Sequence, residues 1–447
     1  MVRRWDIDLE MHRVERSDRY FHHRRGNRLS WGQLIQFITN GILEKGILST
    51  DPQVMGKYHH VTVDEIHDGA IMNEVMLPLL REYFLSRYEQ DGRLRITARS
   101  ATINPHEYIK YFQQGAKRGP SLFKLIGDTP FEITPHYLPL DCPLSKRAAG
   151  AAHLALIIHF RKPLRPLGNT ILSVFPGRGD IQEVETVLHK AQEPIKIERA
   201  TGGGGSMSNL TRLDAIDGHR TIILATNAAE TSITVPDAGY VLDTGVYNQL
   251  VYDYKTRSSE LKTRVISKSQ ADQRRGRVGR TCDGEYFALY AKSDYPGMER
   301  TQRPAITTEN ITPTILRLCA YGRDPRYFPW LHPPTQEQLE GAFNEMMYHK
   351  AADETGTLTG TGYLICSTGL DIIPASFVVS AYGHGSRETR VMAINIAVML
   401  EEYESLFITK SAANIRNVLP RIEKGVGDHK KLGLILDEFI RRGKRKD

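Results

Sequence analysis

The sequence predicts an α/β protein with two parallel-sheet units, followed by a mostly helical region. Between residues 31 and 160, apolar runs such as YHHVTVDE and RLRITARSAT alternate with helical stretches. Strands that alternate with helices are typical of parallel sheets. A second such series, with NTILSVFPG at 169–177 and RTIILATN at 220–227, continues to about residue 300. Beyond it, segments such as RVMAINIAVMLEEYESLF indicate helices separated by turns.

These patterns divide the chain into segments. RKPLRPLGN, at 161–169, has the prolines and glycine of a linker between the two α/β units. YNQLVYDYKTRSSELKTRVIS, at 247–267, has two β-favouring runs around a turn and predicts a hairpin. TGGGGS, at 201–206, is flexible on composition and is either a surface loop, an engineered joint or a backbone cradle for phosphate. We therefore expect a basic N-terminal segment at 1–30, α/β units at 31–160 and 161–300, a helical domain at 301–365, and a helical region with a basic tail at 366–447.

Composition excludes several classes of protein. The 447 residues hold 59 Lys and Arg against 52 Asp and Glu, a net charge of +7 that weakly favours a polyanionic partner. The four cysteines (Cys142, Cys282, Cys319 and Cys366) are far apart and form no CxxC pair, so neither a zinc module nor a disulfide framework is indicated. No apolar run reaches the ~18 residues of a membrane span. These features predict an intracellular, soluble protein with no membrane contact.

One segment concentrates positive charge. QADQRRGRVGR, at 270–280, holds four arginines, two glutamines and two glycines. A glycine lets the backbone approach a ligand closely, and the planar guanidinium group matches phosphate oxygens. The segment therefore predicts a phosphate site, for a nucleotide or for a nucleic-acid backbone.

A carboxylate pair follows a predicted strand. VTVDEIHDG, at 61–69, places Asp64 and Glu65 at the carboxyl end of the strand, where parallel sheets normally bind ligands. One carboxylate can hold Mg²⁺ through water while the other orients a nucleophilic water. Such pairs also occur in exposed turns, and His67 nearby is either a zinc ligand or a loop histidine. The pair alone does not decide between these interpretations.

The order of the motifs is more specific than any one of them. VDEIH is followed by SAT (100–102), ILSVFPGRGDI, ATNAAETSITV (225–235) and QADQRRGRVGR. This succession, over about residues 31–400, resembles the superfamily 2 DExH helicases of the DEAH and RNA-helicase-A type. GDTPFEITPHYL and ISKSQADQRRGRVGR are most similar to the viral branch typified by poxvirus nucleoside triphosphate phosphohydrolase II. The resemblance implies two RecA-like domains, the first incomplete, followed by a winged-helix domain and part of a ratchet domain.

The resemblance also implies a role for individual residues in hydrolysis of ATP with Mg²⁺. Asp64 and Glu65 would hold the metal and activate water, and Gln273 would position that water. Arg277 and Arg280 would stabilise charge on the γ-phosphate, as fixed cations do in phosphoryl transfer. The residues expected to couple the nucleotide site to domain movement are His67, Ser100 and Thr102, and those expected to sense nucleotide are Ser232 and Thr234.

The implied partner is single-stranded or duplex RNA, with DNA as the alternative polymer. Such helicases hold the sugar-phosphate backbone, with little sequence preference. ITNGIL supplies Thr39 and Gly41 in the first domain. PGRGD and ATN supply Arg178, Thr226 and Asn227 in the second.

The sequence departs from the family in one major feature. It contains no phosphate-binding loop of the form G-x-x-x-x-G-K-[ST], whose backbone and lysine normally hold the nucleotide phosphates. We therefore expect weak ATP binding by this chain, and an N-terminal half of the first domain carried on a longer chain or on a partner. Two rival hypotheses stay open at this point: a catalytically degenerate protein that binds nucleic acid or acts as a scaffold, and a metal-dependent phosphatase that uses Asp64 and Glu65.

Overall fold

The computed structural model describes most of the chain from residue 36 onward. The described residues are 36–48, 55–56, 58–88, 94–100, 102, 104–116, 119–125, 130–138, 142–200, 219–227, 235, 237–401 and 427–443. The predicted basic segment at 1–30, the TGGGGS segment, Ser232 and Thr234 lie outside them.

The first unit is built around one long buried helix. Its elements are α2 (Asn40–Leu48), β1 (His60–Val63), the short helix η1 (Ile66–Asp68), α4 (Ile71–Tyr88), β2 (Arg95–Ala98) and α5 (Pro105–Gln113). β1 and β2 pair in parallel. One side of α4 packs on the β1 core through Met76 and Leu80, and another packs against Leu318 and Phe328 through Val75 and Leu79. α4 is therefore buried on two sides, and its buried face includes the polar residues Asn73 and Glu74.

β2 is the polar strand of this unit. Its residues alternate between exposed and half-buried positions, and Arg95 is exposed. At the end of the strand, the Arg99 guanidinium lies 3.9 Å from the Asp64 carboxylate, with both side chains well exposed. Arg95 and Arg99 are therefore accommodated at the surface and are not buried in a closed parallel sheet.

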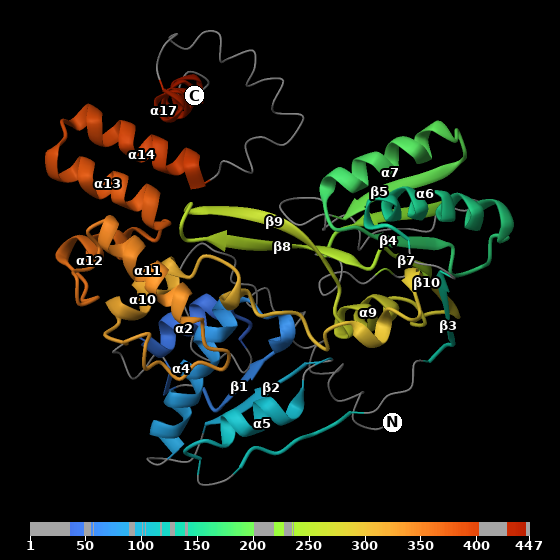
Figure 1. The fold of residues 1–447 in the computed structure, drawn as a ribbon, viewed down its shortest axis with the longest axis horizontal. Coiled ribbons are helices and arrows are strands. Elements are labelled where there is room, and N and C mark those ends of the chain that lie inside the picture. Colours follow the sequence, from blue (N-terminus) through green and yellow to red (C-terminus); the bar gives the residue numbers. More distant parts are fainter. Residues whose placement is uncertain are drawn as a thin grey trace.

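The second unit is a six-stranded parallel sheet with helices on both faces. The strand order is β3-β10-β7-β4-β6-β5. Helices α6 and α7 cover one face, where their apolar residues form one core, and Ala271 of α9 contributes to the core on the other face. Figure 1 shows α6 and α7 above the sheet and α9 on its other side. The bounds are β3 (Ile133–Leu138), α6 (Leu144–Arg161), β4 (Thr170–Val174), α7 (Arg178–Lys190), β5 (Ile195–Ala200), β6 (Arg220–Ala225), β7 (Ala238–Asp243), α9 (Lys268–Arg275) and β10 (Gly284–Ala291).

The division between the two units differs from the expected one. The sequence pattern assigned residues 133–160 to the first unit, whereas β3 pairs in parallel with β10 and α6 packs against α7 and β7 of the second. Local periodicity shows that a segment is a strand but not which sheet it joins, because its partner here lies about 150 residues away. The second unit therefore begins before β3.

An antiparallel hairpin connects the second unit to the helical region. β8 (Val246–Asp253) pairs with β9 (Ser258–Val265) and extends toward α11 and α12 (Figure 1). At its tip, the Arg257 guanidinium lies 3.8 Å from the centre of the Tyr348 ring. Lower on the strand, the Tyr252 hydroxyl donates to the Glu345 carboxylate at 2.9 Å. The hairpin thus has fixed contacts with the helices.

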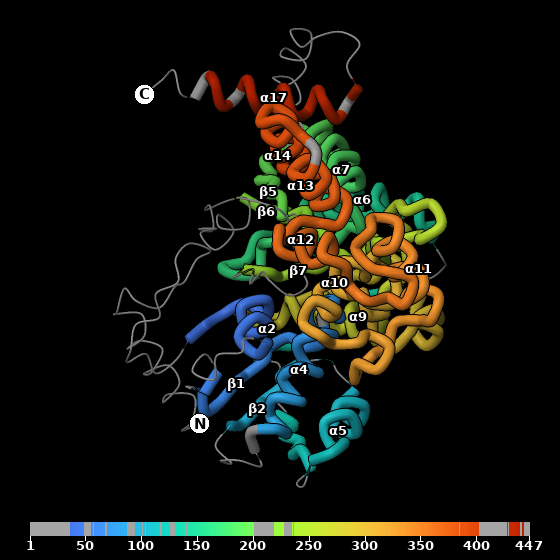
Figure 2. The backbone as a smooth tube through the Cα atoms, turned by 90° about the vertical axis from the view of Figure 1, so that its left-hand side faces the viewer, coloured from blue at the N-terminus to red at the C-terminus, as the bar shows by residue number. Residues whose placement is uncertain are grey.

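The C-terminal part is helical. Its elements are the short helices η3 (Tyr295–Gly297) and η4 (Ala305–Thr307), then α10 (Thr312–Ala320), α11 (Gln336–Tyr348), α12 (Gly360–Thr368), α13 (Ile372–His384), α14 (Arg387–Glu401) and α17 (Asp428–Gly443). Figure 2 shows α12, α13 and α14 rising away from the first unit, with α17 across their end. The predicted fold class, α/β with a helical C-terminal region, is confirmed.

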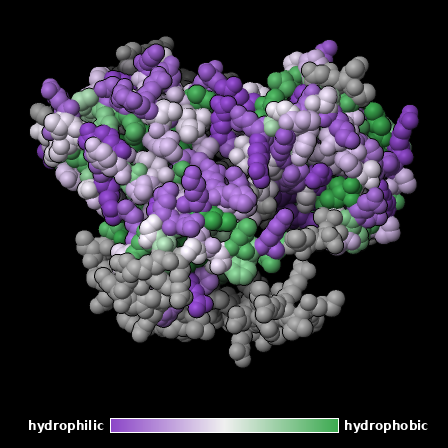
Figure 3. Space-filling view, turned by 60° about the horizontal axis from the view of Figure 1, so that its bottom comes forward, coloured by the Kyte–Doolittle hydropathy of each residue, from purple (hydrophilic) through white to green (hydrophobic). Residues whose placement is uncertain are grey.

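The face in Figure 3 is mainly hydrophilic, with apolar side chains in small, separate groups. In the described part of the chain, no single helix has the length and apolar character of a membrane span, although α12 and α13 together pass that test with a bend of 116° between them.

Candidate functional site

The two carboxylates of VDEIH lie where β1 ends. The Asp64 carboxylate accepts a hydrogen bond from the Glu65 amide at 3.1 Å, and the Asp64 side chain is 62% exposed. Glu65 adopts the left-handed conformation, with φ 51° and ψ 42°. A non-glycine residue in that region is uncommon and is a mark of tight turns and functional sites. The turn leaves both carboxylates accessible to solvent.

His67 connects these carboxylates to the second unit. Its Nδ1 lies 2.8 Å from the Ser100 hydroxyl and 3.2 Å from the Glu65 carboxylate. Its Nε2 lies 2.5 Å from the Gln273 side-chain nitrogen, which is on α9. One tautomer satisfies all three contacts: Nδ1 carries the proton and donates, while Nε2 accepts from the glutamine amide. His67 is therefore the central contact between the two units at this site.

Gln273 makes a second contact across the same junction. Its side-chain nitrogen donates to the Thr102 hydroxyl at 3.0 Å, and the Thr102 amide in turn donates to the Ser100 hydroxyl at 3.2 Å. The helix carrying Gln273 begins with a capping box in which Ser267 and Gln270 bond to each other's backbone amides. The structure thus brings together Glu65, His67, the SAT motif and Gln273, which are far apart in the sequence.

The two arginines of QADQRRGRVGR that were assigned to the nucleotide, Arg277 and Arg280, differ in how exposed they are. Arg277 is half-buried just beyond the end of α9. Arg280 is exposed, and its Nε donates to the Gly276 carbonyl at 3.0 Å. Gly279 has a φ of +74°, and a Cβ at that position would lie 2.6 Å from Ile133. The close backbone approach that this glycine permits is therefore to β3 of the same chain, not to a ligand as its sequence context suggested.

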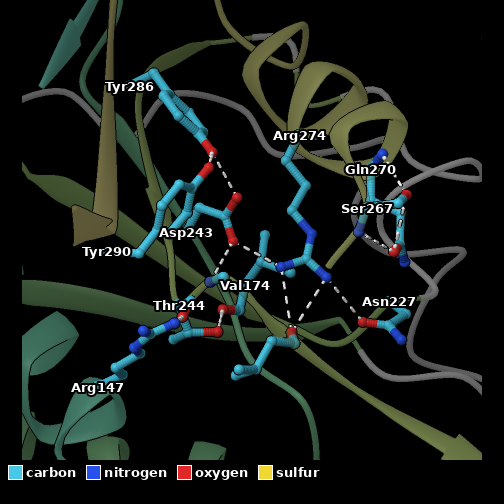
Figure 4. A network of polar contacts seen from close by, with 12 residues as sticks. Arg147, Val174, Asn227, Asp243, Thr244, Ser267, Gln270, Arg274, Tyr286 and Tyr290 are labelled. Atoms are coloured by element: carbon cyan, nitrogen blue, oxygen red, sulfur yellow. Dashed lines mark hydrogen bonds and ion pairs between the residues drawn. The ribbon is translucent and has the colours of Figure 1, made fainter. Parts of the chain in front are cut away.

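Arg274, like Arg275, was given no role of its own from the sequence. It is fully buried, and its guanidinium donates to the Asp243 carboxylate at 2.6 Å and to the Asn227 side-chain oxygen at 3.1 Å (Figure 4). The Tyr286 hydroxyl donates to the other Asp243 oxygen at 2.6 Å and lies 2.8 Å from the Tyr290 hydroxyl. Burial and the Asp243 charge raise the pKa of Tyr286 well above its ordinary value, so the phenol stays a donor.

Helical spacing is the signal that could have identified Arg274. Ala271 and Arg274 are three residues apart and are both buried, whereas Gln273, one residue earlier, is only half-buried and faces the other unit. Residues three or four apart share a helix face. The small apolar Ala271 thus marks the inward face of α9 and places Arg274 on it.

The predicted nucleic-acid contacts lie on both units. Thr39 is exposed at the start of α2, and its carbonyl accepts from the Ile42 amide at 3.0 Å. Arg178 is exposed at the start of α7. Thr226 and Asn227 follow β6 and are half-buried, and the Asn227 side-chain oxygen already accepts from Arg274. Asn227 therefore has a structural contact in addition to its predicted role.

Comparison with known proteins agrees with this arrangement. Residues 158–282 match the helicase conserved C-terminal domain, which covers most of the six-stranded sheet and α9. The probable ATP-dependent RNA helicase DHX34 of Mus musculus is 29% identical over 362 residues, and that of Homo sapiens is 28% identical over 357. The chain is homologous to DEAH/DExH-box RNA helicases. The two alignments cover 77% of this chain but only 30% of each relative, so the chain spans about a third of their length.

Solved structures show the same likeness. The crystal structure of the E. coli DExH-box NTPase HrpB has a TM-score of 0.65 and 25% identity, over 81% of this chain and 43% of HrpB. A second HrpB structure, described as a DEAH/RHA helicase, has a TM-score of 0.67 and 25% identity, over 81% of this chain and 44% of HrpB. These relatives are from mammals and E. coli, and the placement in the viral branch stays a prediction.

Asp64 could hold a metal ion only together with ligands from outside the protein. Among the described residues, no three His, Cys, Asp or Glu side chains are grouped as a protein-only metal site requires. Mg²⁺ commonly takes one or two carboxylates and completes its shell with water and substrate phosphates. The exposed Asp64 carboxylate suits that mode of binding, in which the nucleotide supplies other ligands.

A histidine connects the first unit to the segment before α11. His332 Nδ1 lies 2.7 Å from the Glu74 carboxylate of α4, and its Nε2 lies 3.3 Å from the Glu107 carboxylate of α5. Nearby, the Tyr111 hydroxyl donates to the Pro329 carbonyl at 2.6 Å. Burial lowers the pKa of His332, but the hydrogen bonds and charges of the two glutamates outweigh it, so the pKa is raised overall.

We expect this histidine to make stability depend on pH. A raised folded-state pKa means that His332 contributes stability fully below about pH 6.5, the unfolded value, and loses it as pH rises through the folded value. Urea unfolding between pH 5.5 and 8.5 should show the loss in the wild type and a smaller change in His332→Gln. His189→Gln, at an exposed position of α7, should retain the wild-type profile, and an unchanged profile in His332→Gln would contradict the assignment.

Proposed function

We propose that this protein is an NTP-dependent RNA helicase of the DExH type, which hydrolyses ATP between two RecA-like domains. The observation that carries the proposal is the 2.5 Å contact between His67 and Gln273. It joins the strand-end carboxylates of one unit to the arginine segment of the other. An active site divided between two bodies can couple hydrolysis to their relative movement, since closure completes the catalytic group.

Each residue of the junction has a chemical role in this proposal. Asp64 is a ligand for Mg²⁺, which neutralises charge on the nucleotide phosphates when bound. Glu65 accepts a proton from the attacking water, and its contact with His67 orients the carboxylate. Arg277 and Arg280 supply positive charge to the transferred phosphoryl group. Gln273 positions the attacking water, and its contacts with His67 and Thr102 couple this site to the first unit.

The nucleotide also needs a phosphate-binding loop, which these 447 residues do not contain. We propose that the loop is supplied by further residues of a longer chain or by a partner. The same observation favours a second candidate function, a degenerate protein that binds RNA without hydrolysis. The two candidates agree on RNA binding and differ in hydrolysis, so RNA binding is the first property to test.

We expect weak affinity for single-stranded RNA of any sequence, without ATP. If Arg178 and Thr226 contact phosphates, the affinity should fall with salt, by a log-log slope of about 0.7 for each contact. Arg178→Ala should weaken binding several-fold, evenly across sequences, and lower the slope by about that amount. Filter binding of two RNAs of different sequence at several salt concentrations measures both quantities.

Arg280→Ala is the matched control for Arg178→Ala. Both side chains are exposed arginines of the second unit, but Arg280 is assigned to nucleotide. RNA affinity should therefore change little in Arg280→Ala. Equal loss in the two variants would mean that the arginine segment belongs to the RNA surface, and the division of roles proposed above would be wrong.

A further inference from the structure

A cavity of about 270 Å³ lies where three parts of the molecule meet. Its walls are the start of α4 at Ala70 and Ile71, residues 248–250 of β8, and residues 302–309, which lead into α10. Drug-sized ligands occupy sites of roughly 300 to 1,000 Å³, so a cavity of this size suits a single planar ring system. The cavity is separate from the group formed by His67 and Gln273.

Backbone hydrogen bonds hold the three walls together. The Ala305 amide donates to the Gly69 carbonyl at 2.8 Å, which joins the third wall to the first unit. The Tyr252 amide donates to the Thr308 carbonyl at 2.8 Å, which joins it to the hairpin. A binding site assembled on fixed backbone loses little entropy when a ligand enters.

One wall carries a buried donor without an acceptor. Gln249 is 7% exposed, and among the described residues its side-chain nitrogen has no hydrogen-bond partner. A buried amide that is left unpaired destabilises the fold, so such a group needs an explanation. A ligand with a carbonyl oxygen in the cavity would supply the missing acceptor.

Another wall carries a carboxylate without a cation. Glu309 is half-buried, and burial raises the pKa of its carboxyl group. Within the described part of the chain, its side chain forms no ion pair or hydrogen bond. A carboxylate in this position can accept two hydrogen bonds from neighbouring N–H groups. The cavity thus offers one donor and a double acceptor.

One predicted RNA contact, Gly41, and the neighbour of another, Gly177 beside Arg178, lie near residues of the cavity walls. A Cβ on Gly41 would lie 3.9 Å from the Met72 side chain, in the first turn of α4, next to Ile71. A Cβ on Gly177 would lie 2.9 Å from the Asn248 amide of β8. We therefore expect a strand held by its backbone at both places to run close to the cavity.

We propose that the cavity receives one base of the bound strand and that it selects guanine. The inference rests on the RNA binding proposed above. Guanine presents two adjacent N–H donors, at N1 and N2, beside the O6 acceptor. The donors match the Glu309 carboxylate, and O6 matches the Gln249 amide. In the same position, adenine places its N6 donor against the Gln249 amide and its N1 acceptor against the Glu309 carboxylate, so both protein groups stay unpaired.

The test compares three RNAs of one length, made of repeated AAG, AAA or AA-inosine. Inosine retains O6 and N1–H but lacks the N2 amine, so it removes one of the two donors to Glu309. Fluorescence anisotropy should show that wild-type protein binds the AAG repeat about tenfold more tightly than the AAA repeat, the size expected for a two-point base contact. The inosine repeat should lie between them.

Two substitutions in the cavity complete the test. Gln249→Met keeps the side-chain shape, and Glu309→Gln keeps its size. Each should bring the AAG and AAA affinities within about twofold of each other, while the AAA affinity stays as in the wild type. Gln249→Met should not lower the free energy of unfolding, because it removes an unpaired buried donor. Arg178→Ala should weaken all three RNAs equally, and Glu354→Gln, an exposed carboxylate elsewhere, should change none.

The outcomes separate this inference from the proposed function. Salt-dependent binding with equal affinity for the three repeats would overturn the guanine site and leave RNA binding intact. A guanine preference that persists in both cavity variants would also overturn it. Absence of binding to every repeat would overturn the proposed function together with the site.

Discussion

Replacing Arg274 by alanine should lower the free energy of unfolding by about 3–5 kcal/mol, the usual loss when one partner of a buried ion pair is removed. The Asp243 carboxylate is fully buried and would lose the guanidinium at 2.6 Å. Tyr286 and the Gly245 amide would still donate to it. They are neutral groups and do not replace the lost charge. Urea unfolding of the full chain measures the change.

Arg275→Ala is the matched control, because it removes the same side chain from the next position. Arg275 is 41% exposed, and its guanidinium lies 3.0 Å from the equally exposed Asp272 carboxylate. Exposed pairs contribute about 0 to 1 kcal/mol. If Arg274→Ala and Arg275→Ala have similar effects, the network around Asp243 does not stabilise the second unit as argued here.

A double variant tests whether the ion pair or the space it fills matters more. Replacing Arg274 by methionine and Asp243 by leucine removes both charges and keeps most of the volume. Replacing a whole buried pair by apolar residues is often far less destabilising than removing one partner. We therefore expect the double variant to be more stable than Arg274→Ala.

The strands of the second unit could be predicted because each is apolar along its whole length. β4, β6 and β7 are buried at every residue, which is the pattern of a parallel sheet covered on both faces. The strand β3 differs, since Thr134 and Pro135 are exposed and its other residues are only half-buried. Its place beside β10 depends on a pairing distant in sequence, and no local pattern contains that information.

The candidate site was predictable to the extent that it lies in short motifs. Glu65, His67, Thr102 and Gln273 were chosen from the sequence, and the structure places them in one group. Their roles in hydrolysis stay predictions. The cavity beside Gln249 had no sequence signal, because an unpaired amide is defined by its neighbours in space. Arg274 was missed because charge alone suggested a ligand contact, whereas helical spacing places it in the core.

The largest effect on activity is expected at Glu65. Hydrolysis is best measured in a chimera that joins this chain behind the N-terminal segment of the DExH-box NTPase HrpB, the protein with which it shares its fold. In that chimera, Glu65→Gln should lower kcat for ATP by about 10²- to 10⁴-fold, since it removes the general base for the attacking water. The amide keeps the size of the carboxylate and can still contact His67 Nδ1, so the junction with Gln273 should persist.

Two further measurements decide what a loss at Glu65 means. RNA affinity and its salt dependence should be unchanged in Glu65→Gln, because the phosphate contacts lie on other elements. Glu354→Gln, at an exposed carboxylate in the helical region, should retain full hydrolysis. A loss of RNA binding equal to the loss of hydrolysis would show that Glu65 supports the left-handed turn after β1 and not the chemistry. Retained hydrolysis in Glu65→Gln would assign the general base to another group.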